Sequence, residues 1–277
     1  MTSLLSTLDA ELSDAPATRR DALGTVGKLG LGALLASVPF LKPSAAKAQT
    51  LSGDAGIFNY ALTLEYLERS FYRQALDSGT IPAAVRPLFQ TIYDDEAAHV
   101  DLLRSTLVTI GADPVDYTNS DFAFGDFVTS YAGIAALAQG LEDTGVRAYK
   151  GRAADIMDKG YLQVALQIHS VEARHAAAIR SLEVSPATKG WISNDGQTAP
   201  MAIRPVYGAG SPAAAFPAES NTTQGGVNLA TGLMGYTALQ IAEAFDEPLD
   251  GDLSQPNSTV ISIAGQFITG DEGDGND

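Results

Sequence analysis

Apolar residues recur every three or four positions from about Ser52 to Leu182, and glycine and proline fall mainly between these periodic stretches. That spacing is typical of amphipathic helices that bury one face. The pattern predicts four long helices, at residues 52–76, about 81–110, 122–153 and 156–182. Pro82 and Pro87 fit only the first turns of the second helix, where a missing amide hydrogen costs little.

The segment at residues 112–121 has no helical pattern and contains Pro114. It can therefore serve as the longer connection that lets the third helix run parallel to the second. The sequence predicts an all-α fold, a four-helix bundle over residues 49–185.

Beyond Pro186 the chain becomes rich in Gly, Pro, Asn, Ser and Thr, and a short helix is expected only at about residues 237–245. We interpret residues 186–277 as a long, mostly irregular C-terminal extension. Apolar clusters at residues 206–207 and 260–263 indicate that the extension packs on something, either its own bundle or a partner subunit of a homo-oligomer.

The N-terminal segment, residues 1–48, has the features of an export signal. Thr18-Arg19-Arg20 precedes an apolar run at residues 29–41, and small residues flank Lys47 at a candidate cleavage site. This order resembles a twin-arginine signal peptide, followed by a mature chain that begins near Gln49. The apolar run is shorter than the ~20 residues that span a bilayer, so we expect no stable membrane anchor and a periplasmic or extracellular location.

Composition narrows the possible partners and chemistry. The chain carries 33 acidic against 17 basic residues, a net charge of -16, which repels phosphate backbones and makes nucleic acid a poor partner. It contains no cysteine, so thiolate chemistry, disulfides and iron–sulfur clusters are excluded. Any bound metal must be held by oxygen atoms and imidazole nitrogens.

Two of the three histidines follow a glutamate by three positions, as Glu96…His99 and Glu172…His175. Residues three apart on a helix share a face, so each pair can direct a carboxylate and an imidazole to one point. The separation between Glu65 and Glu142 also matches that between Glu96 and Glu172 to within one position. The sequence therefore indicates two helical hairpins built on one plan.

A bundle of this plan brings one Glu from each of two helices and one Glu–His pair from each of the other two into one layer, the pattern of di-iron and di-manganese carboxylate proteins. All four carboxylates fall on apolar stripes, where unpaired charges are costly and cations relieve them. The predicted ligands of two iron or manganese ions are Glu65, Glu96, His99, Glu142, Glu172 and His175.

Glu68, one turn after Glu65, is the alternative ligand from the first helix. We prefer Glu65, because Glu68 has no matching tyrosine and its counterpart in the third helix is Gly145. Tyr72 and Tyr149 stand two turns after Glu65 and Glu142 and are either hydrogen-bond partners of ligands or core aromatics. His169 is expected to lie beside the ligands and support them, the alternative being an ordinary interior histidine.

Several stretches resemble the exported ferritin-like domain family that includes plant desiccation-related proteins: NYALTLEYLE at 59–68, DEAAHV at 95–100, LEDTGV at 141–146, VEARHAA at 171–177 and AFDEPL at 244–249. The resemblance implies a ferritin-like fold and, through wider kinship with ferritins and rubrerythrins, a metal pair that reacts with dioxygen or peroxide. The long extension departs from compact storage ferritins and puts a 24-subunit shell in doubt.

The leading functional hypothesis is a di-iron or di-manganese oxidoreductase of ferroxidase, peroxidase or catalase type that protects against oxidative or desiccation stress. The alternative is a metal-sequestering or structural stress protein without turnover. Oxygen and imidazole ligands serve iron and manganese equally, so the sequence leaves the metal open.

Overall fold

The computed structural model describes residues 53–182, 184–185, 189–193, 199–233, 235–251 and 258–269. The predicted signal peptide and Pro186 lie outside the described residues.

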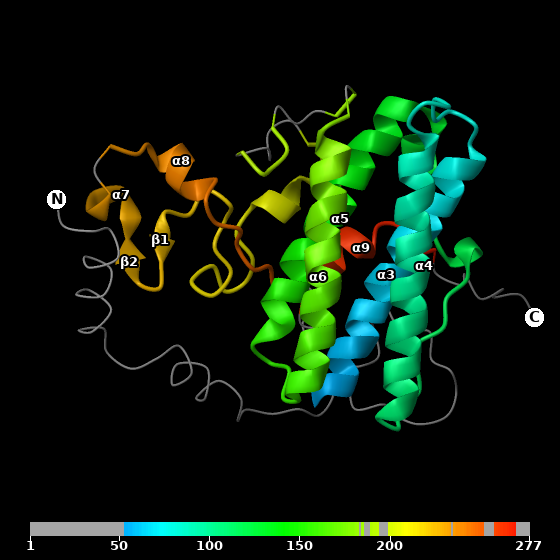
Figure 1. Ribbon diagram of the computed structural model, residues 1–277, viewed down its shortest axis with the longest axis horizontal. Helices are drawn as coiled ribbons and strands as arrows, with labels where there is room; N and C mark the ends of the chain where they lie inside the picture. The colour runs from blue at the N-terminus through cyan, green and yellow to red at the C-terminus, as the bar shows by residue number, and fades with distance from the viewer. Residues whose placement is uncertain are drawn as a thin grey trace, which may run out of the picture.

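Four long helices form the bundle: α3 (Gly53–Asp77), α4 (Arg86–Thr109), α5 (Tyr131–Ala153) and α6 (Lys159–Arg180). Short connections make α3 and α4, and likewise α5 and α6, antiparallel neighbours. Figure 1 shows α4 and α5 running in the same direction, as expected from the longer connection between them. The prediction of an all-α bundle is confirmed.

The predicted start of the third helix, at residue 122, is wrong. The helix α5 begins at Tyr131, where the Ser130 side chain accepts a hydrogen bond from the Gly133 amide. Ahead of it the backbone forms two short 3₁₀ turns, η1 (Asn119–Asp121) and η2 (Gly125–Thr129). Phe122 instead pairs in an isolated antiparallel bridge with Ile268 near the end of the chain. A distant segment therefore takes the backbone groups that a helix would have used.

The other helix starts differ less. Helix α4 begins at Arg86, so Pro87 lies in its first turn and Pro82 precedes the helix. Helix α6 begins at Lys159 instead of residue 156, because the Asp158 side chain accepts hydrogen bonds from two amides of the first turn and caps the helix there.

The described parts of the extension contain only short elements. They are η4 (Arg204–Tyr207), a hairpin of β1 (Thr223–Gln224) and β2 (Val227–Asn228), α7 (Leu229–Gly232), α8 (Ala238–Ala242) and α9 (Thr259–Ala264). Helix α8 lies within the short helix predicted at 237–245. Figure 1 shows β1, β2, α7 and α8 grouped to one side of the bundle.

Helix α5 is buried on all sides between residues 134 and 149, apart from Ala136, because the bundle covers one face and the extension covers the other. Two glycines allow the close approach. A Cβ on Gly140 would collide with the Ile203 side chain, and one on Gly151 would collide with the Leu249 carbonyl oxygen. The described extension thus packs on the bundle of its own chain.

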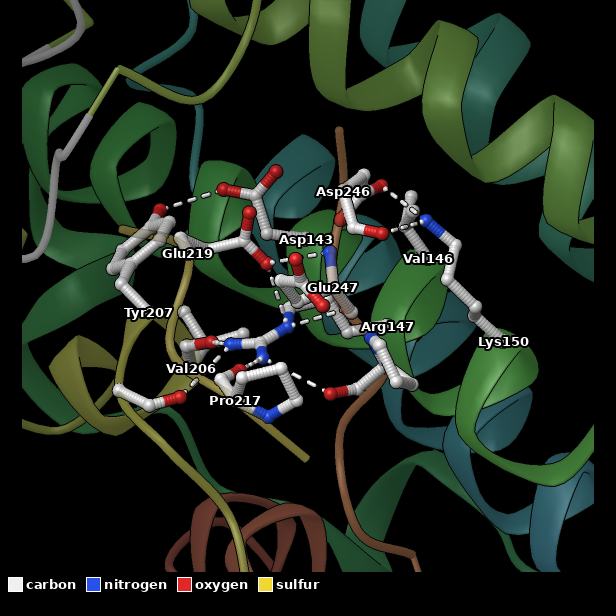
Figure 2. Close-up of polar contacts among 12 residues, drawn as sticks. Asp143, Val146, Arg147, Lys150, Val206, Tyr207, Pro217, Glu219, Asp246 and Glu247 are labelled. Carbon is white, nitrogen blue, oxygen red and sulfur yellow. Dashed lines mark hydrogen bonds and ion pairs between the residues drawn. The ribbon is translucent and has the colours of Figure 1, made fainter. Parts of the chain in front are cut away.

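A buried arginine fixes this contact (Figure 2). Arg147 of α5 is fully buried, and its Nε lies 2.8 Å from Glu219 Oε1. Its guanidinium also donates hydrogen bonds to carbonyl oxygens of Val206, Gly208, Pro217, Glu247 and Pro248. Separate stretches of the extension are thus held by one side chain.

Nearby, Asp143 accepts hydrogen bonds from Tyr207 and Arg180, and the Lys150 ammonium contacts Asp246.

Among the described helices, none is both long enough and apolar enough to cross a membrane.

Candidate metal centre

The bundle interior brings together all six side chains that the sequence singles out. Glu65 comes from α3, Glu142 from α5, and one Glu–His pair from each of α4 and α6. The four carboxylates are completely buried, and His99 and His175 are 8% and 6% exposed. The three-residue spacing places each pair on the inward face of its helix.

These side chains form two groups of four, and in each group one ligand-type atom per residue lies within 4.8 Å of the others. One group contains Glu65, Glu96, His99 and Glu172; the other contains Glu96, Glu142, Glu172 and His175. Glu96 and Glu172 belong to both groups. The arrangement has the form of two neighbouring cation positions joined by two shared carboxylates.

The two imidazoles occupy corresponding places. His99 Nδ1 lies 3.1 Å from Glu65 Oε2 and 3.1 Å from Glu172 Oε1. His175 Nδ1 lies 2.9 Å from Glu96 Oε1 and 3.3 Å from Glu142 Oε2. Each ring therefore directs Nδ1 into the cluster.

The two tyrosines hydrogen-bond to carboxylates across the bundle. Tyr149 of α5 donates to Glu65 Oε1 at 2.5 Å, and Tyr72 of α3 donates to Glu142 Oε1. In both carboxylates Oε1 is held by the phenol, while Oε2 faces a histidine. Of the two roles considered for these tyrosines, the structure shows hydrogen bonding to predicted ligands.

Asp95 is a contact that sequence reasoning missed. Its Oδ2 lies 3.0 Å from Nε2 of His175, on the side of the ring that faces away from the cluster. Such a carboxylate orients a ligating imidazole and fixes which nitrogen carries the proton. The register that aligns Glu96 with Glu172 aligns Asp95 with Val171, so the internal symmetry gave no signal for this contact.

His169 differs from the expectation that it supports the ligands. Its Nδ1 lies 3.0 Å from the backbone carbonyl oxygen of Val146 in α5. The ring is half-buried and satisfied by the backbone, which matches the alternative of an ordinary interior histidine.

Glu68 is buried among the predicted ligands, at 3% exposure, although the sequence favours Glu65 as the ligand from this helix. Burial raises its pKa well above the usual range, and the nearby negative charges of Glu172 and Glu96 raise it further. Helix α3 therefore directs two carboxylates inward, one turn apart.

Burial and mutual contacts shift the pKa values of the side chains in this cluster. Burial raises the pKa of Glu172 well above its usual range, and it raises the pKa of Glu96 to about 8. Burial alone would lower the pKa of His175, but Glu142 and Glu96 outweigh it and raise the pKa to about 12. Glu65 shows the opposite shift, because contact with His99 overcomes burial and lowers its pKa. Without cations, the folded protein must therefore retain protons in this cluster.

Several buried atoms of the cluster touch each other without forming a regular hydrogen bond: Glu96 Oε1 and Glu142 Oε2 lie against His175 Nδ1, and Glu172 Oε1 lies against His99 Nδ1. Glu172 Oε2 has no hydrogen-bond partner among the described residues. Buried carboxylate oxygens are costly when they are unpaired. Carboxylates and imidazoles are also the donors that iron and manganese accept. The residues present fit a pair of such ions.

Comparison with known families agrees with the fold. Residues 53–184 match a family model described as a ferritin-like domain. No curated protein matches the chain. The matched range contains the four long helices and all six cluster residues, which confirms the predicted ferritin-like bundle. The resemblance to exported, desiccation-related members stays a prediction.

Proposed function

Because residues 53–184 form a ferritin-like domain, we propose that its buried cluster binds two iron or manganese ions and that the loaded protein reacts with dioxygen or peroxide. One observation carries the proposal: two groups of ligand-type atoms share Glu96 and Glu172, and Glu96 contacts the imidazole of each group. A single cation would leave one histidine–carboxylate set unused.

The chain supplies equivalent ligands to both positions. Glu65 and His99 would hold one ion, Glu142 and His175 would hold the other, and Glu96 and Glu172 would bridge them. Tyr149 and Tyr72 each donate a hydrogen bond to one oxygen of Glu65 and Glu142, respectively, so the other oxygen of each carboxylate would be left to bind an ion.

The surroundings of the cluster favour controlled chemistry. A pair of redox-active ions can exchange electrons with dioxygen or peroxide. The complete burial of the four carboxylates keeps bulk water away. Burial also raises the pKa values of Tyr72 and Tyr149 well above the usual range, so both phenols keep their protons as donors.

The test compares the metal-loaded full chain with two variants. Metal-free protein is loaded anaerobically with Fe²⁺ or Mn²⁺ and then mixed with dioxygen or hydrogen peroxide, while metal oxidation and peroxide loss are followed. Glu172→Gln should lose most of the reaction because it removes a shared carboxylate. Asp101→Asn, an exposed change on α4, should not.

Reaction rates no faster than those of the free ions, with two ions bound, would reject the oxidoreductase and leave metal sequestration. No bound ions at all would reject both.

We also propose that the protein is exported through the twin-arginine pathway. Arg19 and Arg20, the apolar run at 29–41 and the small residues around Lys47 support this proposal. That pathway carries folded proteins, which suits a chain that acquires its metals before export.

A further inference from the structure

Glu68 is a buried carboxylate to which the six-residue site gives no role. It follows Glu65 by one helical turn, and its Oε2 has no hydrogen-bond partner. A fully buried carboxylate needs a proton, a hydrogen-bond donor or a cation to offset the loss of water. The described residues supply no donor to Oε2.

Gly145 of α5 lies opposite this side chain. A Cβ built on Gly145 would lie 3.2 Å from Glu68 Oε1 and 3.3 Å from Glu172 Oε2. Both distances are tighter than most Cβ contacts, so an added Cβ would make the two carboxylates shift by a few tenths of an ångström. Oxygens of Glu68 and of the shared ligand Glu172 thus flank one point.

The internal repeat relates Glu68 to Gly145. The register that aligns Glu65 with Glu142 also aligns Glu68 with Gly145. One half of the bundle carries an additional carboxylate, and the other half carries the space that admits it. By symmetry alone, the lack of a glutamate opposite Glu68 argues against Glu68 as a ligand. In the folded chain, that same lack leaves space for the Glu68 carboxylate to face the site.

We propose that Glu68 is a seventh metal-binding side chain of this centre and that the missing side chain at Gly145 gives it room. The inference rests on the proposed metal pair. Neither four-residue group includes Glu68; its Oε1 instead lies beside the Gly145 position, as Glu172 Oε2 does. A fifth carboxylate makes the two cation positions unequal in charge and in number of available oxygens, which favours hard, oxygen-preferring ions such as Mn²⁺ and Fe²⁺.

Metal affinity tests this inference without reference to turnover. The metal-free full chain is titrated with Mn²⁺ by calorimetry, in wild type, Glu68→Gln and the exposed control Asp101→Asn, and thermal unfolding of each metal-free protein is recorded. We expect Glu68→Gln to weaken Mn²⁺ binding by about 10-fold or more. The metal-free variant should unfold at the same temperature as wild type or higher, because one member of a crowded acidic cluster is gone.

Gly145→Ala should also weaken Mn²⁺ binding, since it displaces both carboxylates. An unchanged affinity in Glu68→Gln would overturn the inference while leaving the metal pair intact. No Mn²⁺ binding by wild type would overturn the proposed function itself, and this inference with it. If Glu68→Gln does not fold, Glu68→Asp decides instead, because it withdraws the carboxylate by one methylene. A loss of about 10-fold supports the role and an unchanged affinity overturns it.

Discussion

Replacing Arg147 with methionine should destabilise the protein severely. The side chain is fully buried and pairs with Glu219, which is itself 4% exposed. Methionine fills much of the arginine stem but leaves that carboxylate without its cation, and removing one partner of a buried ion pair costs about 3–5 kcal/mol. The five carbonyl oxygens that accept hydrogen bonds from Arg147 also lose their donor. Each of them that water cannot reach adds about 1–3 kcal/mol to the loss of stability. The expected loss, at least about 3 kcal/mol, is a large part of the roughly 5–15 kcal/mol typical of whole domains.

Urea unfolding of Arg147→Met, monitored by helical signal, measures this loss. The matched control is Arg73→Met, which breaks an exposed ion pair with Asp77 and should change stability by less than about 0.5 kcal/mol. The double variant Arg147→Met/Glu219→Leu should recover part of the loss, because it removes the orphaned carboxylate. Limited proteolysis of Arg147→Met should cut first in the extension. A loss below about 1 kcal/mol would refute the assignment of Arg147 as the residue that fixes the extension.

Three further outcomes are expected. Asp95→Asn should weaken one of the two bound ions by about 10-fold or more while sparing the other, because the described residues place a carboxylate behind the ring of His175 and none behind that of His99. Equal weakening of both ions in a titration would contradict this. The metal-free protein should lose stability as pH rises from 5 to 8. In the folded state the pKa of Glu96 is raised to about 8 and that of His175 to about 12, so over this range the folded state holds more protons than the unfolded state. A rise in melting temperature with pH, measured in the presence of a chelator, would contradict this. Replacing Arg19 and Arg20 with lysine should leave uncleaved precursor inside the cell, and continued export on a blot of cell fractions would point to the ordinary secretory route.

Periodic apolar positions were enough to predict the four helices, because each helix buries a stripe that repeats with the helical turn. The convergence of Glu65 with Glu142, and of the two Glu–His pairs, followed from their matching spacing in two similar hairpins. These features are local or repeat regularly, so a single sequence reveals them.

Other features depend on contacts between distant segments. Phe122 looked like the start of a helix, but its backbone pairs with Ile268, which no periodicity in either segment indicates. The attachment of the extension through Arg147 is likewise a set of contacts with carbonyl groups, which every residue carries. The sequence therefore does not indicate which backbone carbonyl groups will accept these hydrogen bonds.

The internal repeat is a poor guide to the roles of two residues, Glu68 and Asp95. In the repeat, the counterpart of Glu68 is Gly145, which argues against Glu68 as a ligand, whereas in three dimensions this glycine lies beside the Glu68 carboxylate and leaves room for it. Asp95 was missed for the related reason that Val171 breaks the repeat. Residues that break an internal repeat can therefore distinguish the two halves of a site.

Anomalous X-ray diffraction from crystals loaded with Mn²⁺ tests the central claim most directly. We predict two anomalous peaks per chain inside the four-helix bundle, each within bonding distance of Glu96 and Glu172, with one also bound by His99 and the other by His175. A single peak in fully loaded crystals, or peaks confined to the acidic surface, would contradict the dinuclear centre.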